Sequence, residues 1–355
     1  MASTTENFNA TASEQPAREF QQHIHVFRGV AICLIVAAHS LPSFDWRSRP
    51  ATFEVIDAIC NQSSIFFFFI AGYLFQHLSS RFHYRNYLNQ KVKTVILPYL
   101  LVSIPAIVIS VFYIPQEGIW PWFYDLPIAS QVGLFYLTGK HLEPLWFVPT
   151  ITLFYLAAPL FLKIDRAPRF YTVIIPLLAL SIVLGRDGPL GPINKAIYLL
   201  PAYLFGMCFS RFREKAEALA TQWKWPLLLA SAAVFSALTN ELRGVDLQIL
   251  LKILSCPLLI LLLKATSYRL NGRLDYIAHI SFGIFFVHAY FISAFRLLYT
   301  LTARETWGGS DTTALFPPSI MGFVLHCAVV LAASVAAIWI VQRLFPRHSR
   351  QLIGA

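Results

Sequence analysis

An arginine and a histidine in the first apolar segment have the types and the spacing to act together on a phosphate-bearing substrate. Arg28 and His39 are eleven positions apart within residues 27–45, a stretch long enough to cross a membrane as a helix. Eleven helical steps place them about 20° apart around the axis and roughly 16 Å apart along it. A guanidinium suits phosphate recognition, and a neutral imidazole suits general-base catalysis near pH 7. The alternative is an arginine that reaches the membrane surface and a histidine that hydrogen-bonds between helices.

Further polar residues have two interpretations each. Ser281 and His288 are seven positions apart, close to two helical turns, so they share a face that could line a site or serve helix packing. The basic loop of residues 81–93, which includes Arg85, could receive phosphates, although such clusters usually mark topology and lipid contact. Lys252 lies inside an apolar segment and is expected to extend to the membrane surface.

The acidic residues are distributed differently from the histidines. None of the eighteen aspartates and glutamates lies in the middle of an apolar segment, which counts against ion-coupled transport. This distribution leaves no obvious carboxylate to orient His39, so a backbone carbonyl or a hydroxyl is the expected partner. The sequence has no P-loop, Gly-x-Ser-x-Gly or His-Glu-x-x-His pattern and no paired-cysteine or metal-ligand spacing, so no metal is expected.

The composition requires membrane-spanning helices to position these residues. Only 13% of the 355 residues are charged, against about 25% in soluble domains, and 57% are hydrophobic. This composition excludes an ordinary soluble protein and a disordered one. It predicts an all-α polytopic membrane protein with about ten spans, and the aromatic stretch 119–137 is expected to be interfacial or re-entrant. The ten predicted spans are residues 27–45, 59–77, 92–113, 145–162, 171–184, 196–209, 225–240, 247–263, 277–301 and 317–344.

The positions of the basic residues predict the orientation. Nineteen of the 28 lysines and arginines fall on the loops and termini of one side, and seven fall on the opposite loops. The positive-inside rule therefore predicts that both termini are cytoplasmic. Because this topology explains most of the net charge of +10, nucleic acid is not expected as a partner. The predicted parts are a polar cytoplasmic tail (1–26) without a cleaved signal, a ten-span domain (27–345) and a basic cytoplasmic tail (346–355).

Taken together, these features resemble the type-3 family of integral-membrane acyltransferases, which modify bacterial surface and exported glycans. The resemblance extends from residue 27 essentially to the C-terminus and is most specific at the element from Arg28 to His39. Because no extracytoplasmic hydrolase-like domain follows, the chain resembles the stand-alone type. Further similarity lies in residues 67–74, 97–99, 144–147 and 281–288.

This resemblance implies an enzyme that transfers an acetyl or succinyl group from cytoplasmic acyl-coenzyme A to a sugar hydroxyl. The acceptor would be an exported polysaccharide or its lipid-linked precursor, and the location the bacterial cytoplasmic membrane. The resemblance assigns catalysis to His39 and donor binding to Arg28 and Arg85. It implies that Trp146, Ser281 and His288 line the site.

The same resemblance implies no tightly bound cofactor, since acyl-coenzyme A is the donor substrate. The implied partners are the glycan, the lipid bilayer and the polysaccharide assembly machinery. Two alternatives remain at this point. One is an exporter of glycans or lipid-linked precursors without acyl-transfer chemistry, and the other is a sensor or assembly subunit of a polysaccharide machine.

Overall fold

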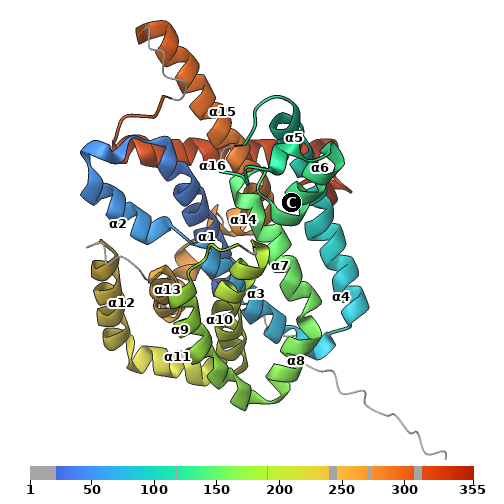
Figure 1. The fold of residues 1–355 in the computed structure, drawn as a ribbon. Coiled ribbons are helices and arrows are strands. Elements are labelled where there is room, and N and C mark those ends of the chain that lie inside the picture. The colour runs from blue at the N-terminus through green and yellow to red at the C-terminus, as the bar shows by residue number, and fades with distance from the viewer. Residues whose placement is uncertain (1–20, 117, 190, 240–245, 271–272, 308–313) are drawn as a thin grey trace, which may run out of the picture.

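The structure is a computed structural model that describes residues 21–116, 118–189, 191–239, 246–270, 273–307 and 314–355 (Figure 1). The described residues form helices and helical turns without a β-strand, which confirms the all-α class. The helices are α1 (Gln22–Ser40), α2 (Pro50–Cys60), α3 (Ser64–His77), α4 (Tyr84–Lys91), α5 (Leu97–Phe112), α6 (Ile128–Thr138), α7 (Phe147–Leu156), α8 (Ala158–Arg166), α9 (Ile174–Leu184), α10 (Pro192–Arg211), α11 (Arg213–Gln222), α12 (Lys224–Thr239), α13 (Gln248–Leu270), α14 (Arg273–His279), α15 (Ser281–Trp307), α16 (Ile320–Leu344) and α17 (Ser349–Ile353).

Six helical segments of the described chain are long and apolar enough to cross a membrane. A seventh candidate consists of Glu143–Leu156 and Ala158–Arg166, which meet at a bend of 54°. Pro159 explains the bend, because proline lacks an N–H group and clashes with the preceding turn. The protein is therefore a multi-pass membrane protein, whereas ten spans and the N-in, C-in orientation remain predictions. The six segments are Gln22–Ser43, Pro50–His77, Tyr84–Phe112, Gln248–Thr266, Ser281–Thr302 and Ile320–Leu344.

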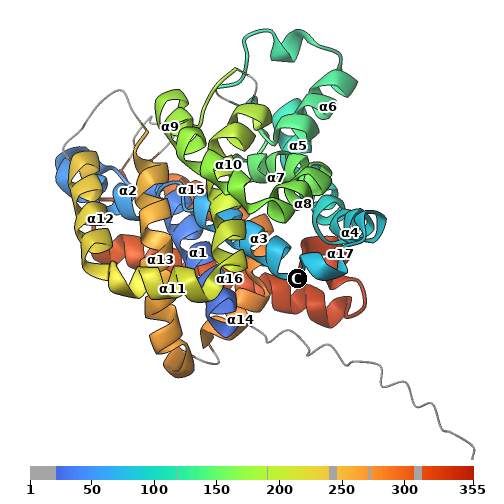
Figure 2. The ribbon, with the colours of Figure 1, turned by 90° about the horizontal axis from the view of Figure 1, so that it is seen from below.

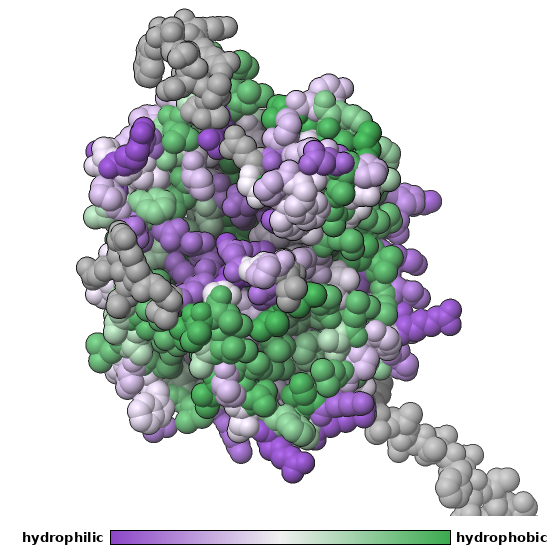
Figure 3. All heavy atoms as spheres, in the orientation of Figure 1, coloured by the Kyte–Doolittle hydropathy of each residue, from purple (hydrophilic) through white to green (hydrophobic). Residues whose placement is uncertain are grey.

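The surface agrees with a membrane environment. Large apolar side chains are exposed along α16, including Met321, Leu325 and Leu344. Figure 3 shows broad apolar areas on one face, with hydrophilic side chains across its middle and along its lower edge. Exposed apolar area of this extent is typical of lipid contact. The predicted interfacial stretch 119–137 overlaps the short helix α6, whose eleven residues are too few to span a bilayer.

Helix α1 lies in the middle of the bundle and carries the two residues of the first hypothesis. It packs against α3, α13, α14, α15 and α16 (Figure 1). Phe27, Ala31 and Ile32 are fully buried in these contacts. A helix that is apolar on nearly every side is buried when its neighbours supply matching apolar surfaces. The positions of Arg28 and His39 are therefore fixed by several helices at once.

The break between α2 and α3 depends on a buried lysine. Lys252 of α13 donates hydrogen bonds to the carbonyl oxygens of Ala58 (2.8 Å) and Ile59 (2.7 Å). Carbonyl groups at a helix C-terminus lack partners within the helix and carry partial negative charge, so an ammonium group stabilises them. The expectation that Lys252 extends to the membrane surface is wrong, because its side chain is enclosed and satisfied by α2.

Two glycines allow α3 and α10 to pack backbone to backbone. A Cβ atom on Gly72 would lie 2.0 Å from the carbonyl oxygen of Tyr203, and one on Gly206 would lie 2.0 Å from that of Phe69. Small residues at such crossings are characteristic of membrane helix pairs, because they allow close approach. The α3–α10 pair thereby supports the wall of the cavity described below.

We expect Gly206→Ala to destabilise the protein by about 3 kcal/mol, because the methyl group must push α10 away from α3. Thermal unfolding of the purified protein in detergent would measure the loss. Gly133→Ala on α6 is the matched control, since a Cβ atom there meets nothing within 4 Å. Equal unfolding temperatures for the two variants would contradict the close-contact explanation.

The last ten residues belong to the packed structure. Helix α17 folds back against α5, α15 and α16. Figure 2, the view from below, labels it near α4. Gly354 lies close to Phe282 and Phe286 of α15. The segment predicted as a basic tail therefore contributes to the wall of the same cavity.

Candidate active site

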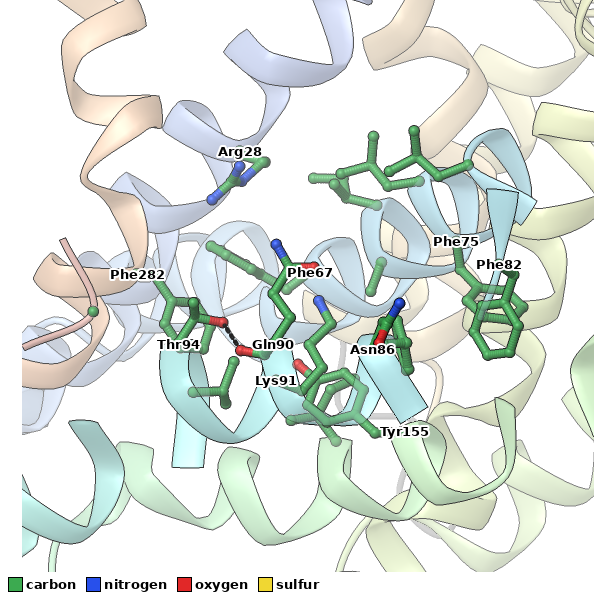
Figure 4. Close-up of a pocket in the computed structure, with 18 of the residues that line it drawn as sticks. Arg28, Phe67, Phe75, Phe82, Asn86, Gln90, Lys91, Thr94, Tyr155 and Phe282 are labelled. Carbon is green, nitrogen blue, oxygen red and sulfur yellow. Dashed lines mark hydrogen bonds between the residues drawn. The ribbon is translucent and has the colours of Figure 1, made fainter. Parts of the chain in front are cut away.

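A cavity of about 1060 Å³ opens beside Arg28, at what we call the Arg28 end of the bundle. Its walls come from α1, α3, α4, α7, α15 and α17, so segments distant in sequence enclose it. Figure 4 shows Arg28 facing Gln90 and Lys91 across this space, with Phe67 and Phe282 in the wall. The volume is at the upper end for small-molecule sites, which suits a large ligand.

The charge of the cavity is strongly positive. Arg28, Arg81, Lys91 and Arg350 all line it, and no aspartate or glutamate side chain does so in the described part of the chain. Arg28, Lys91 and Arg350 are close enough to repel one another. Arg28 is held by one neutral hydrogen bond, which its Nη2 donates to Ser281 Oγ at 3.1 Å. Cations gathered without acidic side chains attract a polyanion such as a group of phosphates.

Lys91 is brought into the cavity by an irregularity in its helix. A π-helical turn, Val92–Ile96, joins α4 to α5 directly after it, and such turns are frequent at functional sites. The Nζ of Lys91 lies 5.3 Å from the ring centre of Tyr87 and 5.1 Å from that of Tyr155. These rings hold the ammonium group by cation–π attraction and leave it facing the cavity.

Arg85 occupies a different position from the one implied by the resemblance. It is exposed on α4 and does not line the cavity. Lys91 is six positions further along, which corresponds to about 240° around a helix, so the two side chains point in different directions. The basic loop contributes Arg81 and Lys91 to the cavity wall, and its role in receiving phosphates stays a prediction.

A second group of polar side chains surrounds His39 at the opposite end of α1, the His39 end. The rings of His39 and His288 are 5.4 Å apart between centres. His288 is fully buried, and its Nδ1 lies 3.0 Å from the carbonyl oxygen of Ile284. Its Nε2 is buried and has no hydrogen-bond partner within the described chain.

A carboxylate faces His39, contrary to the expectation from the sequence. Glu143 Oε2 lies 3.7 Å from His39 Nδ1, close enough for an ion pair when the imidazole is protonated. The Glu143 side chain is 75% exposed and that of His39 is 20% exposed, so the pair opens to the surroundings. Glu143 begins a short turn, Glu143–Trp146, that is followed directly by α7. The available signal was its position directly before the Pro144-to-Trp146 pattern noted in the sequence.

Trp146 lies in the same turn as Glu143 and is surrounded by charge. Lys195 Nζ is 5.0 Å from the centre of its ring, and the guanidinium of Arg186 is 5.7 Å from it. Asp187 pairs with both cations. Burial opposes ionisation of Asp187, but hydrogen bonds and charge from Lys195 and Arg186 prevail and lower the pKa of its carboxyl group. The His39 end thus presents an aromatic ring bordered by charged groups, a surface suited to a polar ligand.

A scan against known protein families matches residues 22–342 to the model described as an acyltransferase domain. The chain belongs to the type-3 acyltransferase family. The chain is therefore an acyltransferase, as the resemblance implied. Comparisons with curated proteins and with solved structures gave no match. Residues of both groups fall within the matched region, except Arg350 of α17, which lies beyond it.

In the acyltransferase, the polar groups around Arg28 and around His39 lie at two depths, or levels, between the same pair of helices, α1 and α15. At one level Arg28 of α1 contacts Ser281 of α15, and at the other His39 of α1 contacts His288 of α15. The sequence predicted that each pair shares a helix face, and the structure brings the two faces together. Trp146 belongs to the His39 level through its turn, whereas Arg85 belongs to neither.

Proposed function

We propose that this acyltransferase moves an acetyl or succinyl group from acyl-coenzyme A to a sugar hydroxyl of an exported polysaccharide or its lipid-linked precursor. The membrane is the bacterial cytoplasmic membrane, and the Arg28 end faces the cytoplasm, where the donor is available. The orientation rests on the excess of lysine and arginine on that side of the chain. The acceptor meets the donor at the His39 end.

One observation carries the proposal: a cationic cavity and a histidine–carboxylate pair lie at opposite ends of the same helix. The cavity provides the charge and volume for the phosphates of a coenzyme A donor. His39 and Glu143 provide a base and a group that orients it. An exporter without acyl-transfer chemistry would need neither this pairing nor its placement opposite a phosphate site.

The reaction requires one proton transfer and one exchange of bonds at the acyl carbon. His39 accepts the proton of the sugar hydroxyl while the hydroxyl oxygen attacks the thioester carbonyl carbon. A C–O bond forms and the C–S bond breaks. Coenzyme A leaves as its thiolate, which takes up a proton. With Nδ1 turned toward Glu143, Nε2 of His39 is the nitrogen available to the hydroxyl. Glu143 then stabilises the imidazolium that forms.

The acceptor binds on the surface formed by Trp146, Arg186 and Lys195. The indole ring supplies apolar contact for the face of a sugar ring, and the charged groups supply hydrogen bonds to its hydroxyl groups. The exposed Glu143 marks the side from which the hydroxyl approaches His39. Polysaccharide assembly proteins are the partners that would deliver the acceptor there.

Mass spectrometry of the exported glycan from cells with and without the gene tests this function. We expect base-labile acyl esters to be present in the parent strain, absent from the deletion strain and restored by complementation. The same spectra identify the acyl group and the acylated sugar. Unchanged ester content with reduced glycan export would contradict the enzyme and favour an exporter.

A further inference from the structure

A layer of phenylalanine rings connects the cationic cavity to the histidine pair. Phe67 and Phe147 belong to the cavity wall, with 6.2 Å between their ring centres. Behind them, the ring of Phe285 lies 5.1 Å from that of Phe147 and 6.2 Å from that of His288. All three phenylalanines are buried. A group that passes from Arg28 toward His39 therefore meets rings rather than open space.

The same layer can be followed along α15. Phe282 lines the cavity, Phe285 follows three residues later, and His288 follows after three more. Six residues advance roughly 9 Å along a helix, so Phe282 and His288 lie at different depths on α15. The ring centres of Phe282 and Phe285 are 5.8 Å apart, so contact is continuous from the cavity to His288.

The layer contains no group that could satisfy a charge. Phe67, Phe147 and Phe285 present only carbon and hydrogen, and a carboxylate placed among them would lose its hydration without gaining a partner. The cations of the cavity lie on the Arg28 side of the layer. Dense ring packing also leaves little volume for additional methylene groups.

We infer that Phe147 and Phe285 select the acyl group, admitting a short uncharged group such as acetyl to His39 and excluding charged or longer ones. This inference rests on the proposed function. It concerns the part of the donor beyond the sulfur atom, since the C–S bond must break within reach of His39 while the phosphates stay at the Arg28 end. It narrows the choice between acetyl and succinyl donors to acetyl.

Inside-out membrane vesicles from cells that carry the gene provide a direct test, because they contain the native acceptor and expose the Arg28 end under the proposed orientation. The vesicles would receive radiolabelled acetyl-, propionyl-, butyryl- or succinyl-coenzyme A, and label in base-labile esters of the glycan would be counted. Vesicles from the deletion strain give the blank. We expect acetyl to be incorporated at least about tenfold faster than butyryl or succinyl.

Phe147→Ala should lower the acetyl-to-butyryl ratio by about tenfold, since it opens space next to Phe285. Phe147→Leu should admit propionyl with less loss of packing, which keeps the test valid if the alanine variant folds poorly. Phe154→Ala is the matched control, because Phe154 is equally buried on the same helix but does not line the cavity. It should leave the donor ratios unchanged.

The outcomes separate this inference from the proposed function. Efficient use of succinyl by the parent protein would overturn the inference, as would donor ratios in both Phe147 variants equal to those of Phe154→Ala. In either case acetyl transfer would remain, and the proposed function would stand. If no donor labels the glycan above the blank, the proposed function itself fails.

Discussion

Replacing His39 with alanine should reduce acyl transfer to the glycan by about a thousandfold, because no other group at the His39 end can take its place as a base. Glu143 is a weaker base, and His288 is enclosed by α15 and the phenylalanine layer. Label transfer from acetyl-coenzyme A in membrane vesicles measures the rate. The amount of exported glycan should not change, since export does not use this imidazole.

Two further variants make the His39 result specific. His326→Ala removes another buried membrane histidine, which packs against Phe44, Phe295 and Phe316, and should retain activity. Glu143→Gln should slow transfer roughly tenfold, because an exposed carboxylate at 3.7 Å is partly screened by water. Acylation at the parent level in His39→Ala would exclude His39 as the catalytic base.

Arg28→Gln should raise the KM for acetyl-coenzyme A by about tenfold to a hundredfold with a smaller change in kcat. A hydrogen bond to a charged group contributes about 1.5–3 kcal/mol, and Arg28 lines the cationic cavity, where it would donate such a bond to a donor phosphate. Arg28→Lys should fall between the parent and the glutamine variant, because it keeps the charge but loses the planar geometry. Initial rates at a series of donor concentrations give both constants.

The matched control for Arg28 is Arg85→Gln. Arg85 is exposed and lies outside the cavity, so we expect the KM of the Arg85→Gln variant for acetyl-coenzyme A to stay within about twofold of the parent value. A rise in KM for Arg85→Gln equal to that for Arg28→Gln would instead support the role that the family resemblance gave to Arg85. Arg350→Gln, which removes a lining cation contributed by α17, should raise the KM without affecting kcat.

Much of the site could be predicted from periodicity within single helices. The eleven-residue spacing of Arg28 and His39 and the seven-residue spacing of Ser281 and His288 each define one helix face. In the structure Arg28 meets Ser281 and His39 meets His288. Helical geometry is local, so the sequence contains it.

Other parts could not be predicted, because they depend on how distant segments pack. Glu143 lies more than a hundred positions from His39 and reaches it only when the turn before α7 docks against α1. The sequence predicts that Lys252 extends to the membrane surface. In the structure its ammonium group caps the C-terminus of α2, because α13 packs beside it. Arg85 and Lys91 are both basic residues of the same loop, so the sequence does not tell which one lines the cavity. The orientation of α4 decides that Lys91 does and Arg85 does not.

The sequence by itself determined that this chain is an all-helical membrane protein, that its family is the type-3 acyltransferases, and that Arg28 and His39 head the list of polar residues for chemistry. The fold class follows from composition and the two residues from spacing along one helix, whereas the family follows from the resemblance and from the family-model match over residues 22–342. Only the tertiary structure decided which carboxylate faces His39, which cations surround the cavity and which rings separate the two levels. The physical reason is that a membrane site is assembled at contacts between helices, and the packing of buried surfaces sets those contacts.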